Sequence, residues 1–267
     1  MKKQLLTALF GCLCTSVAVA VSANSDTGDW RGKKAAVSLT YDDALSVHID
    51  NVKPTLDKYG FKGTFYVTVS SEPFKSRMDE WRRLAKEGHE LGNHTMFHPC
   101  DGSLPGRDWV SEATDLSKWT AQRMVDNIRM TNVLLQAVDG KTERTFAYTC
   151  GDKSAAKGES FVAQVMQNFP GARGVQGGYD TLAGMDLSDI RSFMIMGDSA
   201  DKLISRVDEA IKQGALAVFL FHGVGGEHGL DVSKEAHDAL VAYLDKRKQE
   251  VWVAPMIDVV DYVKSQR

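Results

Sequence analysis

The sequence predicts an α/β fold with a parallel sheet, because short β-rich runs alternate with amphipathic helical stretches. Residues 36–39 and 64–69 are apolar runs on either side of a helical pattern, which is the rhythm of βαβ units. Such units recur along the chain without a repeat, a low-complexity tract or a linker, and a loose count gives seven or eight. We therefore expect one domain over residues 24–267, since barrels of this length are routinely single domains.

Hydrophobic periodicity places the elements. In the first helix, residues 46–59, Ile49, Val52, Leu56 and Tyr59 recur at steps of three and four, and Gly60 follows as a left-handed C-cap. Further helices are expected near residues 79–87, 118–138, 160–168, 200–213, 233–246 and from 256 onward. Strands are expected near residues 36–39, 64–69, 90–92, 145–148, 173, 192, 216–221 and 251–253. Residues 98–117 lack periodicity and predict a long loop, the kind that is usually functional.

Residues 1–23 have the pattern of a secretory signal peptide. Two lysines precede a short apolar run, and small residues follow with cleavage expected after Ala20 or Ala23. A membrane anchor is the alternative, but polar residues interrupt a run already shorter than the ~20 residues that a span needs. Residues 9–12 also resemble a lipoprotein cleavage box, which would tether the chain through Cys12. We expect export to the periplasm or the extracellular space.

The net charge limits the possible binding partners, and the cysteine content bears on a disulfide. The net charge is −3 with no block of like charges, which excludes nucleic acid and anionic membrane as partners. Removal of the signal peptide leaves Cys100 and Cys150 as the cysteines of the mature chain. On spacing alone, one disulfide and two unrelated thiols are both open, because connectivity cannot be read from sequence.

Four polar motifs each follow a predicted strand directly. In a parallel barrel, chemistry gathers at the carboxyl ends of the strands, so these motifs are expected to meet at one face. They are Tyr41-Asp-Asp43, His94-Thr-Met-Phe-His98, Tyr148-Thr-Cys-Gly151 and Phe221-His222-Gly223.

The histidine pair predicts a metal site. His94 and His98 are four residues apart, which on one helical turn would place both imidazoles on the same side. A surface pair is the alternative, and the nearby Asp43 favours the metal. Two imidazoles and one carboxylate leave a coordination position open for water, as in catalytic zinc sites. Non-haem iron oxygenases use the same donor set. Secretion and the order of the motifs favour the hydrolytic metal site over an iron oxygenase.

Two further residues are candidates for acid–base chemistry. Asp42 adjoins Asp43 but points another way, so it can face the substrate and take a proton from water that the metal has activated. Its alternative role is to cap the following helix. His222 is the candidate general acid, and its alternative is a neutral core histidine at the end of a buried strand.

Other histidines and tryptophans carry weaker signals. His48 and His89 are expected to be structural, while His228 and His237 could line the mouth of the site or be solvated. Trp109 and Trp119, on or beside the long loop, could stack on sugar rings or simply pack in the core.

These motifs resemble those of the polysaccharide deacetylases, carbohydrate esterase family 4 with NodB homology. The resemblance covers essentially the whole mature chain and implies a distorted (β/α) barrel with seven or eight parallel strands. Thr40-Tyr-Asp-Asp43 resembles the first motif, whose first Asp is the base and whose second binds metal. His94-Thr-Met-Phe-His98 is similar to the second motif, which supplies two metal histidines, and Leu220-Phe-His222 to the fifth, whose His is the acid.

The chain departs from the family at the third and fourth motifs. Alignment on Gly151 puts Ala147 where the family has an Arg that steadies the base, so this support is expected to be missing. The backbone N–H of Cys150 would face the oxyanion, with Tyr148 beside it on the substrate. The fourth motif has no clear counterpart, which leaves three candidates to orient His222: Asp180, Asp186 and Asp198.

The resemblance also bears on the cysteines and the function. Cys100 follows the second motif and Cys150 lies within the third, so both are expected at the barrel mouth, which favours a disulfide. The implied activity is metal-dependent removal of acetyl groups from a carbohydrate such as a chitin-like polymer, peptidoglycan or acetylated xylan. Zn²⁺ is the expected metal, with Co²⁺ also suitable. The rival is a secreted, non-catalytic carbohydrate- or metal-binding protein that keeps the fold.

Overall fold

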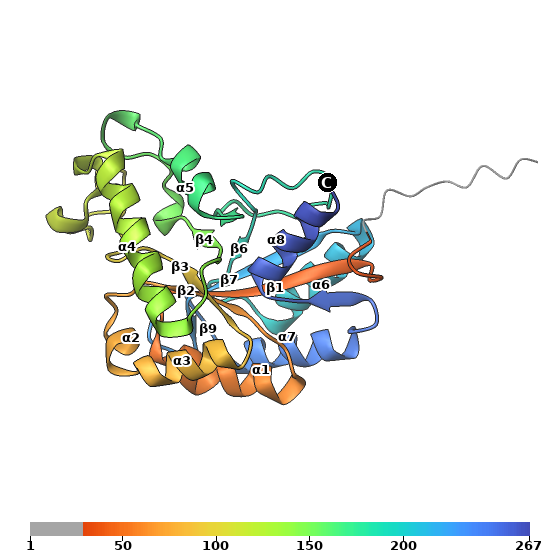
Figure 1. Ribbon diagram of the computed structural model, residues 1–267. Coiled ribbons are helices and arrows are strands. Elements are labelled where there is room, and N and C mark those ends of the chain that lie inside the picture. The colour runs from red at the N-terminus through yellow and green to blue at the C-terminus, as the bar shows by residue number, and fades with distance from the viewer. Residues whose placement is uncertain (1–28) are drawn as a thin grey trace, which may run out of the picture.

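The computed structural model in Figure 1 describes residues 29–267. The predicted signal peptide, and Cys12 within it, lie outside these residues. Among the described residues, no helix combines the length and hydrophobicity that crossing a membrane requires.

Eight parallel strands form the main sheet. They are β1 (Ala35–Asp42), β2 (Thr64–Val67), β3 (Glu90–Asn93), β4 (Phe146–Ala147), β5 (Ala172–Arg173), β6 (Phe193–Met194), β7 (Leu216–Phe221) and β10 (Val251–Val253). The order is β5-β4-β3-β2-β1-β7-β6, and β10 also pairs with β1. β7 runs along one side of β1, while β10 and β2 share the other side, β10 at its start and β2 at its end.

The sheet curls into a distorted barrel, as the sequence predicts. Ile190 bridges to Arg173 of β5, and the same segment continues into β6, which pairs with β7. Residues 190–194 therefore connect the two ends of the strand order. The carboxyl ends of β1, β3, β4 and β7 consequently face a common space.

Within residues 29–267, eight α-helices surround the sheet. They are α1 (Lys53–Tyr59), α2 (Glu72–Ser76), α3 (Met78–Lys86), α4 (Ala121–Asp139), α5 (Val162–Asn168), α6 (Ala200–Gln213), α7 (Lys234–Lys246) and α8 (Met256–Ser265). A π-helical turn, His48–Val52, leads into α1, and Gly60 ends α1 in the left-handed conformation that the sequence predicts. Helix α2 is an element that periodicity did not predict. Its Ser71 N-cap accepts a hydrogen bond from the Phe74 N–H.

The core has two layers, one on each face of the sheet. The side chains of β1 point alternately into these two layers. Odd-numbered β1 residues such as Val37 and Leu39 pack against the outer helices, among them α1, α6 and α7. Ala36 faces the other way and packs against α8, through Met256 and Val259 among others. Figure 1 shows α1 and α7 on one side of β1 and α8 on the other. Asp42 shares the α8-facing side of β1 and ends the strand.

Shorter elements build the rim. A two-stranded pair, β8 (Gly223–Val224) and β9 (Asp231–Val232), holds the turn between them. Single 3₁₀ turns lie at Glu112–Thr114, Leu116–Lys118, Thr149–Gly151 and Ala156–Gly158. Apart from the first and part of the second of these turns, residues 98–117 form the irregular loop that the sequence predicts.

Candidate active site

A pocket of about 600 Å³ opens at the carboxyl ends of the strands. It brings together the polar residues that follow four different strands, as expected for a parallel barrel. The predicted site residues that line it are Asp42, Asp43, His94, His98, Tyr148, Cys150 and His222, and they are joined there by Arg107, Trp109 and His228.

Asp43 is the centre of this cluster. Its Oδ1 lies 3.6 Å from His94 Nε2 and 3.5 Å from His98 Nε2. Its Oδ2 lies 4.0 Å from His222 Nε2 and 3.8 Å from His228 Nε2. Burial raises the pKa of Asp43, but the four surrounding imidazoles more than offset burial and the pKa falls to about 2. The carboxylate is therefore ionised at any pH relevant to function.

The residues present fit a divalent metal. The ligand atoms of Asp43, His94 and His98 all lie within 4.8 Å of one another. Tetrahedral bonds of about 2.1 Å separate neighbouring ligand atoms by about 3.4 Å, close to the carboxylate–imidazole distances here. The Nδ1 of His94 lies 2.9 Å from the Ala147 carbonyl, which fixes the tautomer with the Nε2 lone pair facing Asp43. Burial lowers the pKa of His94 to about 4, so this lone pair is free at neutral pH.

The backbone of the histidine pair differs from the expectation of a helical turn. His94 and His98 lie in an irregular segment after β3, with φ of 66° at Thr95 and 50° at His98. The His98 N–H donates to the Thr95 hydroxyl, and the Thr95 N–H donates to the Asn93 side chain. Pro99 additionally disfavours the α conformation at His98, the last residue of the motif.

Asp42 has the cationic partner that sequence alignment seemed to exclude. Arg173 of β5 donates to Asp42 Oδ2 at 2.5 Å, and both side chains are buried. Arg173 on β5 is the register partner of Ala147 on β4, and Ala147 occupies the family's arginine position. The positive charge therefore lies on the neighbouring strand, at the same height in the sheet. The expectation of a missing Arg is therefore wrong. An arginine inside a predicted buried strand was the signal, because such residues are rarely buried unpaired.

The alternative role of Asp42 as a helix cap is also wrong, because the following helical turn begins at His48 with Val47 as its N-cap. Asp42 Oδ2 is held by Arg173, whereas its buried Oδ1 has no hydrogen-bond partner among residues 29–267. One oxygen of the carboxylate is thus fixed and the other is available.

His222 follows β7 and is largely buried, and this burial lowers its pKa. Its Nδ1 has no hydrogen-bond partner within the described part of the chain. The three candidate partners are engaged elsewhere: Asp180 with the Arg191 N–H, Asp186 with Ser188, and Asp198 with Lys202 and Arg206. None of them orients His222, and that expectation is wrong.

His228 completes the imidazole cluster. Its ring stacks on that of His222, with centroids 4.7 Å apart and planes inclined by 12°. The Leu230 N–H donates to its Nδ1, so the neutral ring carries its proton on Nε2, the nitrogen that faces Asp43. His228 thus lines the mouth, one of its two expected positions.

The remaining histidines lie in the interior. His48 is buried, with its Nε2 2.8 Å from the His222 carbonyl oxygen, and His89 is buried beside Phe65. His237 is buried as well and contacts the Tyr41 hydroxyl, so neither position expected for it, at the mouth or in solvent, is correct.

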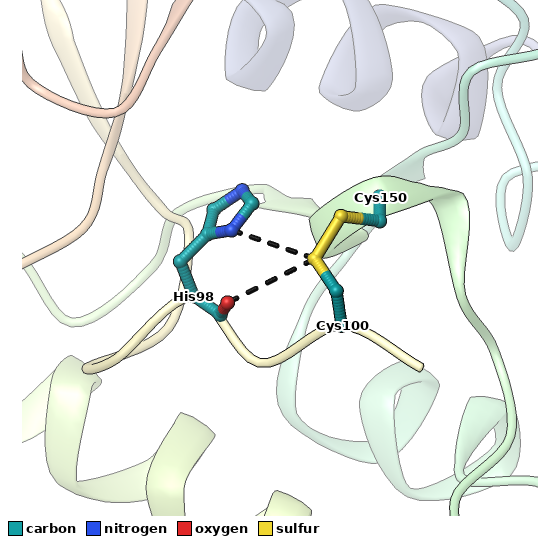
Figure 2. Close-up of side chains that lie close together, drawn as sticks. All are labelled: His98, Cys100 and Cys150. Carbon is teal, nitrogen blue, oxygen red and sulfur yellow. Dashed lines mark hydrogen bonds between the residues drawn. A yellow bond between two sulfur atoms is a disulfide. The ribbon is translucent and has the colours of Figure 1, made fainter. Parts of the chain in front are cut away.

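The long loop is tied to the site at several points. Cys100 and Cys150 form a disulfide with their Cα atoms 5.8 Å apart, beside His98 (Figure 2). Arg107 donates to the Cys150 carbonyl and pairs with Asp152. The loop thereby holds Trp109 at the pocket rim.

The two tryptophans of this region behave differently. The Trp109 side chain is 64% exposed, whereas Trp119 is 2% exposed and donates its N–H to the Ala113 carbonyl. Stacking on a sugar is therefore excluded for Trp119. Tyr148 is among the residues that line the pocket, but its side chain is buried and its hydroxyl donates to the Ser188 carbonyl.

Known proteins resemble this chain in sequence. The sequence profile of the polysaccharide deacetylases matches residues 30–164. A gellan lyase from a Bacillus species is 26% identical over 255 residues, which is 86% of this chain and 9% of the lyase. The peptidoglycan-N-acetylmuramic acid deacetylase of Bacillus subtilis is 26% identical over 115 residues, 43% of this chain and 37% of that protein. The chain thus spans less than half the length of either relative.

Solved structures share the fold. A Mycobacterium smegmatis protein described as a candidate polysaccharide deacetylase has a TM-score of 0.63 at 14% identity, covering 88% of this chain and 92% of that one. A family 4 acetyl xylan esterase from Clostridium thermocellum, determined with a cobalt ion, has a TM-score of 0.55 at 19% identity, covering 86% and 92%. These structures show the shared fold, and the profile match over half of its length shows that the chain belongs to the polysaccharide deacetylase family.

Proposed function

We propose that the protein is an exported, divalent-metal-dependent deacetylase that removes acetyl groups from a carbohydrate. The observation that carries the proposal is the convergence of two carboxylates and four imidazoles in one open pocket at the carboxyl end of the barrel. Asp43, His94 and His98 are the proposed metal ligands, with Zn²⁺ as the expected ion and Co²⁺ as a substitute. Export rests on residues 1–23, whose sequence has the signal-peptide pattern.

The bound metal would supply a Lewis acid for the acetyl carbonyl and lower the pKa of the attacking water. Asp42 acts as general base in this proposal. Arg173 holds its Oδ2, which keeps the carboxylate in one orientation, and Oδ1 has no hydrogen-bond partner among residues 29–267. The proton would move from the water to the Asp42 carboxylate as the water oxygen attacks the acetyl carbon.

His222 is the proposed general acid, on the opposite side of Asp43 from the histidine ligands. It gives a proton to the leaving oxygen or nitrogen of the sugar, so that acetate and a free hydroxyl or amine result. The Cys150 N–H, in a left-handed turn with φ of 54°, would donate to the developing oxyanion. His228 presents an Nε2–H beside His222 and can hold the substrate there.

The pocket rim supports a sugar as substrate. Trp109, Val175 and Met194 line it and are at least partly exposed, which provides an apolar surface for the face of a pyranose ring. Related proteins are described as acting on peptidoglycan and on acetyl xylan. We propose an acetylated polymer or oligomer of this kind, chitin-like polymers included, with either an amide or an ester as the scissile group.

A binding protein without turnover is the second candidate. It is favoured by the unpartnered Nδ1 of His222 and by the absence of a recognisable fourth motif. The buried Asp42–Arg173 pair argues against it, because a site that only binds metal needs no second carboxylate with a dedicated cation.

A measurement of acetate release decides between the deacetylase and the binding protein. The protein should release acetate from acetylated xylo-oligosaccharides, chito-oligosaccharides or peptidoglycan, lose the activity on chelation, and regain it with Zn²⁺ or Co²⁺. No release from any of these substrates would favour the binding protein, and release that survives complete metal removal would contradict the mechanism.

Two variants separate the proposed roles of the aspartate base and the ligands. Asp42→Asn should retain metal and lose turnover, whereas His98→Ala should lose metal. Metal content measured by atomic spectroscopy and acetate release give the two readouts. Equal metal loss in both variants would mean that the roles of Asp42 and Asp43 are misassigned.

A further inference from the structure

His98 presents its two ring nitrogens to two different groups. Its Nε2 lies 3.5 Å from Asp43 Oδ1, on the side of the proposed metal site. Its Nδ1 lies 3.5 Å from Cys100 Sγ, on the side of the disulfide, as Figure 2 shows. The ligand atoms of His98, Cys100 and Cys150 all lie within 4.8 Å of one another. One imidazole is therefore shared between two clusters of metal-binding atoms.

The second cluster has a well-defined chemistry once the disulfide is opened. Two thiolates and one imidazole make a Cys₂His donor set, which holds zinc in some enzymes with a fourth position left open. Thiolate ligands select thiophilic ions such as Zn²⁺ and Cd²⁺ over Mg²⁺ or Ca²⁺. Because His98 and Cys150 both line the pocket, the fourth position would face solvent or substrate.

Contacts other than the disulfide hold the two cysteines close together. The Thr149 hydroxyl donates to the Pro99 carbonyl, which joins the residues adjacent to Cys150 and Cys100. The Asp101 N–H donates to the Asp152 carboxylate, which joins the residue after Cys100 to a residue two positions beyond Cys150. These bonds do not involve sulfur, so they keep the Cα atoms near their separation of 5.8 Å after the disulfide is reduced.

We propose that reduction of Cys100–Cys150 creates a second metal site, formed by the two sulfurs and His98 Nδ1, for a thiophilic divalent cation. The disulfide takes up two electrons and two protons from a dithiol, which is itself oxidised to a disulfide, and metal binding then displaces the thiol protons. The existence of this site does not depend on deacetylation, whereas its competition with the site of Asp43, His94 and His98 rests on the proposed function.

The shared imidazole makes the two sites mutually exclusive. A neutral imidazole has one lone pair, and a metal on Nδ1 leaves the proton on Nε2. His98 then faces Asp43 with an N–H and no longer serves as a ligand there. Reduction in the presence of metal therefore transfers the ion from the site with Asp43 and His94 to the site with the two sulfurs.

Cobalt spectroscopy tests the second site directly. The protein is compared with the disulfide intact and after reduction with a phosphine, which is oxidised to the phosphine oxide with water supplying the oxygen and is then removed without air. The reduced protein, shown by thiol titration to carry two thiols, should give a sulfur-to-cobalt charge-transfer band on addition of Co²⁺, and the oxidised protein should not. Two titratable thiols without this band would overturn the proposal.

Three variants locate the signal. His94→Ala should bind Co²⁺ poorly when oxidised yet still show the sulfur band when reduced, because His94 belongs only to the first site. Cys100→Ser with Cys150→Ser should remove the band and leave cobalt binding insensitive to phosphine. Should the double serine variant fail to fold, the comparison in His94→Ala still decides the matter. A band that persists in His98→Ala at unchanged cobalt affinity would contradict the shared imidazole.

Discussion

The Asp42 carboxylate receives its hydrogen bond from Arg173, whose register partner on the neighbouring strand is Ala147. Neighbouring strands in a sheet are about 4.8 Å apart, a distance that a long arginine side chain can span. What orients the carboxylate of the proposed base is the position of the guanidinium in space. The sequence position of the arginine that carries it matters less. An arginine on either β4 or β5 at this level could reach the same oxygen.

Moving the arginine from position 173 to position 147 tests whether either strand can supply the cation. Arg173→Ala should lower kcat by roughly 10–100-fold, the usual effect of removing a residue that orients a catalytic group. Adding Ala147→Arg to it should recover a substantial part of the loss. Steady-state kinetics and metal content measure both effects, and the metal content should not change.

The matched control is a second buried arginine. Arg144 pairs with Asp139 and donates to the Leu91 carbonyl, with no contact to the pocket. Arg144→Ala should cost about 3–5 kcal/mol in the free energy of unfolding, as for other broken buried pairs, while leaving kcat of the folded protein unchanged. A double variant at 147 and 173 no more active than Arg173→Ala would contradict the equivalence of the two strands.

At the scale of elements, the loop of residues 98–117 is held against one side of the site by two ties. The disulfide and the Arg107–Asp152 pair tie it to the turn after β4. Trp109, two residues after Arg107, is the large aromatic side chain that the loop offers to the pocket. We therefore expect Trp109 to contribute to substrate binding and not to the proton transfers.

Trp109→Ala should accordingly raise KM by roughly 3- to 10-fold, since an aromatic contact contributes about 0.5–1.5 kcal/mol beyond burial. The kcat should change little, because Trp109 contacts neither Asp42 nor His222. Trp119→Ala is the paired control: it removes a buried side chain and should lower the melting temperature instead. If Trp109→Ala lowered kcat and left KM unchanged, the loop would have to take part in the chemical step.

Elements differ in how well sequence predicted them. The helix ending at Gly60 and the strand of residues 216–221 were predicted because their periodicity and end signals are local. The turn that carries His94 and His98 was not, because its shape depends on the Asn93 side chain, which is bonded to α4. Spacing along the chain found the two residues but gave the wrong backbone between them.

At the scale of the whole molecule, burial lowers the pKa of five histidines, and for three of them the pKa falls far below its ordinary value. Burial lowers the pKa of His48, His89 and His94 from 6.5 to about 4 each. In the unfolded chain they titrate near 6.5, so below this pH the unfolded state binds more protons. The stabilising contribution of these groups is complete above pH 6.5 and is lost as the pH falls through 4.

The metal-free protein should therefore lose stability between pH 6.5 and pH 4, by an amount on the order of several kcal/mol in total. Urea denaturation at a series of pH values measures the loss. Proton NMR of the imidazoles provides the control, since His48 should not titrate in the folded protein until about pH 4. A free energy of unfolding that is constant over this range would show that these rings are not held neutral by burial.

The fold and the proposed ligands could be predicted together because both depend on local patterns. Each polar motif follows its own strand, and parallel topology then brings the motifs to one end. The Asp42–Arg173 pair could not be predicted in this way, since the two residues are 131 positions apart and meet only across the closed barrel. The contact of His228 with His222 likewise depends on the turn between β8 and β9.

The register pairing of Ala147 with Arg173 also affects how active members of the family are recognised. A search pattern that demands arginine in the third motif would class this chain as degenerate. A pattern that accepts arginine at either of two positions facing each other across β4 and β5 would keep it. Such a pattern requires a positive charge at one place in space. It therefore separates chains that have lost the cation beside the proposed base from chains that carry it on the neighbouring strand.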